Sequence, residues 1–77
     1  MTDAPNTARY RAQVLTASRL VESLIAEISL TKDRSEVFDF KRRAMEVISS
    51  LHSPDRERLA ERVEDAVAER LRRDGET

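Results

Sequence analysis

The amino-acid sequence predicts an all-α fold in which an antiparallel helical hairpin is followed by a third helix, giving a three-helix bundle. Apolar residues recur at steps of three and four along three stretches, which is the spacing of one helix face. A sustained alternation of apolar and polar residues, as a strand would show, is not found. Gly75, Pro5 and Pro54 all lie where a helix is expected to begin or end, so nothing interrupts the three stretches.

The first helix is expected over residues 7–30. Asn6 or Thr7 can cap it, because a short side-chain oxygen there accepts a hydrogen bond from a free first-turn amide. The apolar residues that follow are separated by four, three, four, three and four positions and form one stripe: Tyr10, Val14, Ala17, Val21, Leu24 and Ile28. Leu15 and Leu30 fall outside this stripe and are interpreted as scattered surface leucines, which are common in folded proteins.

The second helix is expected over residues 33–52. Asp33 followed by Glu36 resembles a capping box, with Asp in place of the usual Ser or Thr. The apolar residues of this stretch are Val37, Phe38, Phe40, Ala44, Met45, Val47, Ile48 and Leu51. At about 100° per residue they cover an arc of roughly 180°. Such a helix needs neighbours on two sides, so it is expected to be the central element.

The third helix is expected over residues 54–73. It opens with a capping hydroxyl on Ser53 and a proline at Pro54, where the missing amide hydrogen costs nothing. Its apolar stripe contains few large side chains: Leu59, Val63, Val67 and Leu71. This helix is therefore expected to bury less surface than the other two.

The chain as a whole is interpreted as one helical domain over residues 7–73. Its 77 residues leave room for one small domain, and no internal repeat or low-complexity tract divides them. The segments at residues 1–6 and 74–77 are expected to be flexible tails.

A domain of this size is expected to need help in burying its apolar surface. Below about 80 residues a single core rarely supplies more than about 3–5 kcal/mol without disulfides, metals or partners. The chain has no cysteine, and the second helix carries more apolar surface than a sparse third helix can cover. We therefore expect a homodimer or docking on another protein. The residues expected at that contact are Tyr10, Val14, Val21, Phe38, Phe40, Lys41, Met45 and Ile48.

Two features of the second helix have competing interpretations. Phe38 and Phe40 lie on opposite edges of its apolar arc, where an aromatic side chain either anchors a partner or belongs to the core. Lys41 lies within the arc, where burial could lower its pKa and make it a base. Because no companion catalytic group is identifiable, the favoured interpretation of Lys41 is a stem lying over the core with its ammonium group in water.

Enzymatic function is not expected. The absence of cysteine excludes a cysteine nucleophile and a thiolate metal site, and His52 is the lone histidine, too few for a zinc site. The chain also has no Ser/His/Asp arrangement, HExxH motif or glycine-rich phosphate loop. No catalytic residue, metal, cofactor or small-molecule substrate is therefore predicted.

Nucleic-acid binding is the alternative function, because the second and third helices resemble a helix-turn-helix in outline. The basic side chains that would reach phosphates are Arg42, Arg43, Arg70, Arg72 and Arg73. Against this interpretation, 14 basic and 15 acidic residues give a formal net charge of −1, and acids are distributed along the third helix. Arg70 also lies toward the apolar side, where it suits either an ion pair with another subunit or an exposed helix end.

The sequence therefore predicts a non-enzymatic helical protein–protein interaction module, an adaptor, regulator or assembly subunit that acts through an apolar helix face. No apolar run approaches the roughly 20 residues of a membrane span, and the N-terminus does not resemble a signal peptide. A cytoplasmic location without membrane contact is expected. Arginine far outnumbers lysine, which is typical of proteins from GC-rich bacterial or phage genomes.

Overall fold

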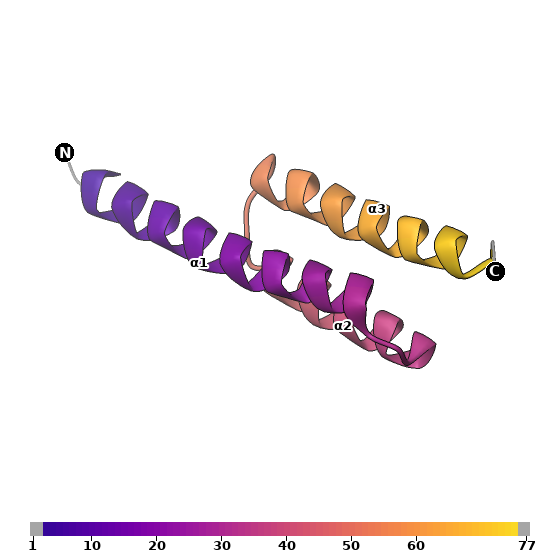
Figure 1. Ribbon diagram of the computed structural model, residues 1–77. Helices are drawn as coiled ribbons and strands as arrows, with labels where there is room; N and C mark the ends of the chain where they lie inside the picture. Colours follow the sequence, from indigo (N-terminus) through magenta and orange to yellow (C-terminus); the bar gives the residue numbers. More distant parts are fainter. Residues whose placement is uncertain (1–2, 76–77) are drawn as a thin grey trace.

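The computed structural model describes residues 3–75, and these form three helices joined by two short connections. The helices are α1 (Asp3–Leu30), α2 (Arg34–Ile48) and α3 (Asp55–Gly75). Each helix packs against both of the others, and α2 runs antiparallel to α1 while α3 returns in the direction of α1 (Figure 1). The predicted all-α three-helix bundle is confirmed, and α3 completes it within the same chain.

The helix ends differ from the predicted ones. α1 begins at Asp3, so part of the stretch expected to be a flexible tail belongs to the helix, and residues 1–2 and 76–77 lie outside the described part. α2 ends at Ile48, four residues before the predicted end, because the hydroxyls of Ser49 and Ser50 donate to the carbonyls of Glu46 and Val47. Side-chain bonds of this kind compete with continuation of the helix.

The start of α2 is fixed by Asp33, the predicted cap residue, but the reciprocal bond of a capping box is not formed, because the Asp33 amide donates to the hydroxyl of Thr31 instead of to Glu36. Its carboxylate accepts hydrogen bonds from the amide of Ser35 at 3.0 Å and from the hydroxyl of Ser35 at 2.7 Å. These bonds lower the pKa of Asp33, the hydroxyl contributing most. Glu36 makes its contact with Thr31, whose hydroxyl donates to the Glu36 carboxylate at 2.6 Å. The turn between α1 and α2 is therefore held by side chains on both sides of the cap.

The core runs along the common axis of the three helices. Its buried apolar residues are Ala17, Val21, Ile28, Val37, Ala44, Ile48, Leu51, Leu59, Val63 and Val67. Those with large side chains contribute roughly 1.5–3 kcal/mol each by leaving water. All three helices and the turn after α2 contribute residues to this core. The hairpin of α1 and α2 therefore has no core separate from α3.

α1 is longer than its neighbours, and its first turns project beyond the bundle (Figure 1). At about 1.5 Å per residue, its 28 residues greatly exceed the 15 residues of α2 in length. The Cα trace consequently measures 57 × 17 × 14 Å. None of the helices within residues 3–75 combines the length and apolar character that crossing a membrane requires.

Candidate protein-interaction surface

The residues expected to contact a partner differ widely in exposure. Val21 and Ile48 are buried in the core, Phe38 is 51% exposed, and the rest are half-buried: Tyr10, Val14, Phe40, Lys41 and Met45. The premise that the apolar arc of α2 needs a second molecule is therefore met only at Phe38. The physical reason is that α1 and α3 pack on two sides of α2 and cover most of the arc.

Tyr10 joins α1 to the turn between α2 and α3. Its hydroxyl donates to the carboxylate of Asp55 at 3.0 Å and accepts the backbone amide hydrogen of His52 at 3.0 Å. The rings of Tyr10 and His52 stack with their centroids 5.0 Å apart. Since the His52 nitrogen in this contact belongs to the backbone, the cluster is no proton-transfer chain. Tyr10 acts as a clamp within the chain.

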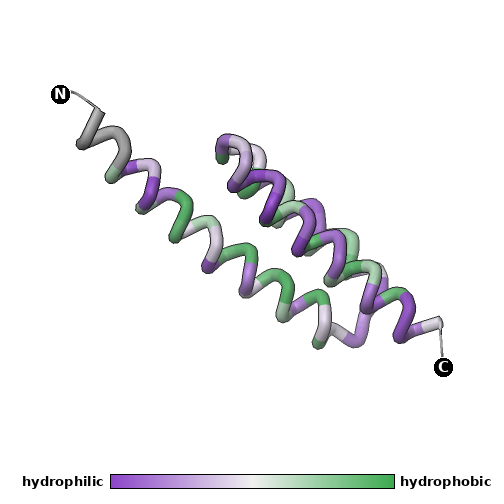
Figure 2. The backbone as a smooth tube through the Cα atoms, turned by 90° about the horizontal axis from the view of Figure 1, so that it is seen from above, coloured by the Kyte–Doolittle hydropathy of each residue, from purple (hydrophilic) through white to green (hydrophobic). Residues whose placement is uncertain are grey.

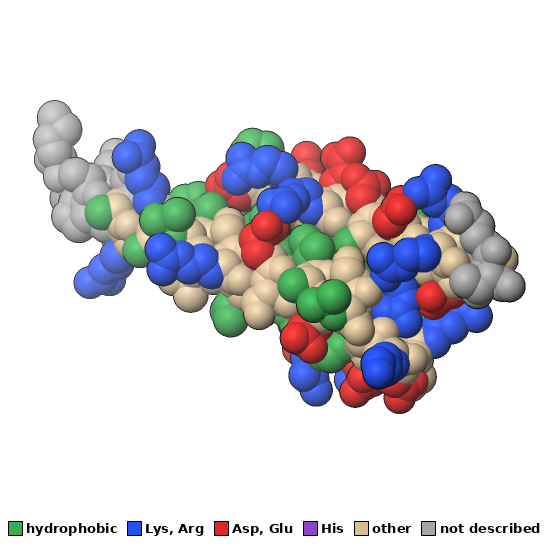
Figure 3. Space-filling model, viewed as in Figure 1, with side chains coloured by type: hydrophobic (Ala, Val, Ile, Leu, Met, Phe, Trp, Pro, Cys, Tyr) green, Lys and Arg blue, Asp and Glu red, His purple; other side chains and the backbone are tan. Residues whose placement is uncertain are grey.

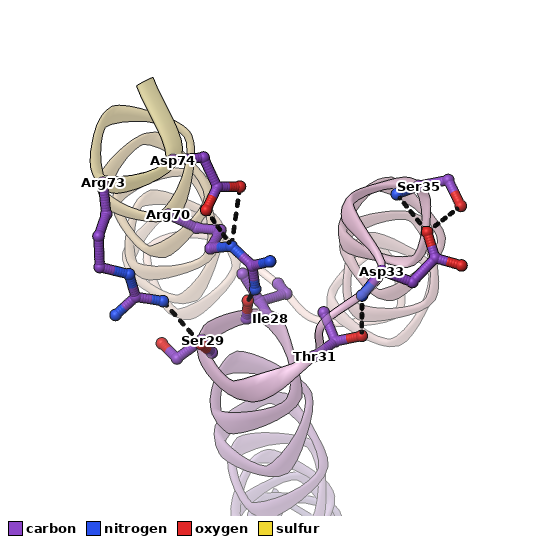
Figure 4. A network of polar contacts seen from close by, with 8 residues as sticks. All are labelled: Ile28, Ser29, Thr31, Asp33, Ser35, Arg70, Arg73 and Asp74. Carbon is purple, nitrogen blue, oxygen red and sulfur yellow. Dashed lines mark hydrogen bonds and ion pairs between the residues drawn. The ribbon is translucent and has the colours of Figure 1, made fainter. Parts of the chain in front are cut away.

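Arg70 joins α3 to the end of α1, at the end of the bundle opposite to Tyr10 (Figure 4). Its side chain is 8% exposed, its Nε donates to both carboxylate oxygens of Asp74 at 3.0 Å, and its Nη1 donates to the carbonyl of Ile28 at 2.9 Å. Arg73 donates to the carbonyl of Ser29 at 2.7 Å. The last carbonyls of a helix have no partner within that helix, so these two arginines of α3 complete the end of α1.

The other basic residues considered for nucleic acid are also engaged within the chain. Arg42 pairs with Asp39 at 3.2 Å, and the guanidinium of Arg43 lies 5.9 Å from the ring centroid of Phe40. Arg72 pairs with Glu69, which lowers the pKa of the Glu69 carboxyl. On the face seen in Figure 3, acidic side chains are interspersed among the basic ones. The structure thus offers no single basic surface on that face.

An exposed stripe that includes apolar side chains lies on α1, roughly opposite the stripe that fills the core. Seven exposed residues follow one another at steps of three and four along this side: Ala8, Ala12, Leu15, Arg19, Glu22, Ala26 and Leu30. We call this set the α1 outer face. Leu15 is 60% exposed and Leu30 is 77% exposed, and the three alanines are exposed too. α1 therefore presents apolar side chains both to the core and to solvent.

Two shallow depressions flank the N-terminal half of α1. One, of about 430 Å³, lies between α1 and α2 and includes Leu20. The other, of about 480 Å³, is lined by α1 residues including Leu15 and by Asp55 of α3. Leu20 is 50% exposed. The outer face is thus bordered by hollows into which side chains of a docked helix can insert.

Sequence reasoning missed the α1 outer face because it treated Leu15 and Leu30 as unrelated surface residues. A signal was present in the repeat of alanines and leucines at helical spacing. Alanine carries little apolar weight, so this second stripe is faint beside the stripe that starts at Tyr10.

No protein-family model, curated protein or solved structure matches this chain. Among the described residues, no cluster of histidine and carboxylate side chains has the arrangement of a metal site. The site is accordingly interpreted from the exposure, charge and spacing of its own side chains.

Proposed function

We propose that this protein is a small non-enzymatic protein–protein interaction module that docks through the α1 outer face. The observation that carries the proposal is the exposure of Leu15 and Leu30 on a helix whose opposite side already fills the core. A helix with apolar residues all round is typically buried on all sides. Here α2 and α3 cover one side, and a partner covers the other.

The free energy gained by burying the exposed apolar side chains of the α1 outer face supports docking. Burying a leucine side chain contributes roughly 1.5–3 kcal/mol, and the alanines allow a second helix to approach closely. Loss of rigid-body and side-chain freedom offsets part of this gain. The two leucines and three alanines together give a reversible contact of moderate affinity, as suits an adaptor, a regulator or an assembly subunit.

This surface differs from the one that the sequence suggests. Burial places Val21 and Ile48 inside the bundle, so docking through them would require the helices to separate. Phe38 remains accessible on α2, yet it is a single exposed aromatic side chain. The α1 outer face extends from Ala8 to Leu30, which makes it the better docking surface.

The proposal is tested by placing a photo-crosslinking amino acid at position 15 and, as a matched control, at position 68 in cells that produce the protein. Leu15 and Ala68 are both exposed helix positions, but only Leu15 belongs to the α1 outer face. We expect discrete crosslinked species from position 15 and none from position 68. Adducts of equal yield at both positions, or none at position 15, would contradict the proposal.

A further inference from the structure

We propose that the α1 outer face binds the same face of a second copy of this chain, with the two α1 helices antiparallel. This inference rests on the proposed function and specifies its partner. α2 and α3 lie together along one side of α1, which leaves the other side open to a second helix (Figure 2), and Arg62 of α3 reaches the outer face through its ion pair with Glu22. A two-fold symmetric contact uses one surface twice, and that surface must therefore be complementary to itself.

Charge provides the first element of self-complementarity. Arg19 and Glu22 lie at the centre of the α1 outer face, three positions apart. In an antiparallel pair centred between them, Arg19 lies opposite Glu22 of the partner subunit, and the reciprocal pair forms by symmetry. Arg19 makes no hydrogen bond or ion pair with another described residue. Glu22 uses its Oε1 for Arg62 at 2.6 Å, which leaves its second carboxylate oxygen for the partner.

Side-chain size provides the second element. The alignment that pairs Arg19 with Glu22 also places Leu15 opposite Ala26 of the partner subunit. One layer further out, Leu30 lies within one residue of the position directly opposite Ala12 of the partner subunit. Each large side chain thus meets a small one, the arrangement that lets facing helices interdigitate without voids. Charge and size therefore select the same register independently.

The parallel arrangement lacks both elements. It would place Arg19 against Arg19 of the partner subunit and Glu22 against Glu22 of the partner subunit, and like charges across an interface oppose association. It would also place leucine against leucine and alanine against alanine, which gives uneven spacing along the contact. The sequence of the α1 outer face accordingly favours the antiparallel dimer.

Disulfide trapping tests the register directly, since the chain has no native cysteine. Leu15→Cys and Ala26→Cys are prepared as separate proteins, mixed, and oxidised gently. We expect a disulfide-linked heterodimer as the main product of the mixture, because Cys side chains at these positions face each other only between antiparallel copies. As a control, Leu15→Cys is mixed with Ala68→Cys, whose position lies outside the contact. Predominant Leu15→Cys homodimers, or equal linkage to Ala68→Cys, would overturn the register.

A charge exchange tests the central pair without altering the core. Arg19→Glu alone is expected to raise the dimer dissociation constant about tenfold, because two attractive contacts become repulsive. Arg19→Glu combined with Glu22→Arg restores the pairing and should return the constant to within about threefold of the original. Arg62→Ala, which removes the intrachain partner of Glu22, serves as the control for loss of that ion pair. An unrestored double variant would contradict the proposed contact.

Sedimentation equilibrium of the unmodified protein separates this inference from the proposed function. A dimer that Leu15→Asp dissociates and Ala68→Asp leaves intact supports the antiparallel pairing. A monomer throughout the micromolar range overturns the dimer. In that case, crosslinks from position 15 to other proteins would still support the docking module, whereas their absence would remove both proposals.

Discussion

Arg70 of α3 donates a hydrogen bond from its Nη1 to the backbone carbonyl of Ile28, which lies near the end of α1. The donor is almost fully buried, and the acceptor is one of the carbonyls that α1 cannot satisfy by itself. Asp74 accepts from the same guanidinium and balances its charge. Together with Arg73, which donates to the carbonyl of Ser29, Arg70 thus ties the first and third helices together at the end of the bundle remote from Tyr10.

We expect Arg70→Met to lower the free energy of unfolding by about 2–3 kcal/mol, the usual cost of losing a hydrogen bond to a charged group in a buried place. Methionine retains an unbranched apolar stem, so the loss reports on the donors rather than on packing. Urea denaturation followed by circular dichroism measures it. Arg72→Met, at an exposed position, is the control and should have a much smaller effect; equal losses would contradict the role of Arg70.

We expect Tyr10→Phe to destabilise the fold by about 1–2 kcal/mol, because the His52 amide and the Asp55 carboxylate each lose a partner. The ring stays in place and still stacks on His52, so helix content should not change. Thermal unfolding of the variant and of Gln13→Ala, which removes a 3.4 Å exposed contact, provides the comparison. A Tyr10→Phe protein as stable as the original would mean that the clamp has no energetic role.

Stability should decline in acid partly through Asp33. The bonds from Ser35 lower the pKa of this carboxyl, so the folded state holds the ionised form more strongly than the unfolded state does. The resulting stabilisation is present above the ordinary pKa of about 4 and is lost as the pH falls through the lower folded-state pKa. Thermal melts of the original protein and of Asp33→Asn between neutral and strongly acidic pH test this. The asparagine variant should lose less stability over that range.

The periodic apolar pattern was sufficient to predict three helices in a bundle, but it did not show whether the third helix packs within the chain or on another subunit. The first, second and third helices each carry a stripe at helical spacing, and the cap at Asp33 has the expected side chain. The end of α2 was less predictable, since Ser49 and Ser50 are compatible with a helix until their hydroxyls bond to its carbonyls. Whether a serine hydroxyl bonds to a helix carbonyl depends on the side-chain geometry, which cannot be read from the amino-acid sequence.

The candidate site was harder to predict than the fold. Whether Met45 and Phe40 are covered depends on which faces of α1 and α3 meet α2, and the apolar pattern of α2 alone does not contain this information. The role of Arg70 was equally hard to predict, because the carbonyl of Ile28 that accepts its hydrogen bond lies far away in the sequence. The α1 outer face was recognisable in principle, yet its alanines gain importance only once the other side of α1 is known to be filled.

Neighbouring residues of α2 provide a direct test of which apolar side chains belong to the core. Val37 is fully buried, whereas Phe38 is half exposed. We expect Val37→Ala to cost about 2 kcal/mol of unfolding free energy, since it leaves a cavity between tightly packed helices. Phe38→Ala should change this free energy by less than about 0.5 kcal/mol, as surface substitutions usually do.

Phe38→Ala and Leu15→Asp together compare the two candidate contact surfaces in an association measurement. Because Phe38 is absent from the α1 outer face, Phe38→Ala should leave sedimentation behaviour unchanged while Leu15→Asp alters it. If Phe38→Ala abolished assembly and Leu15→Asp did not, the docking surface would include α2, in keeping with the surface of the first and second helices that the sequence predicts. Chemical denaturation of both variants, run beside the sedimentation experiment, separates a loss of association from a loss of folding.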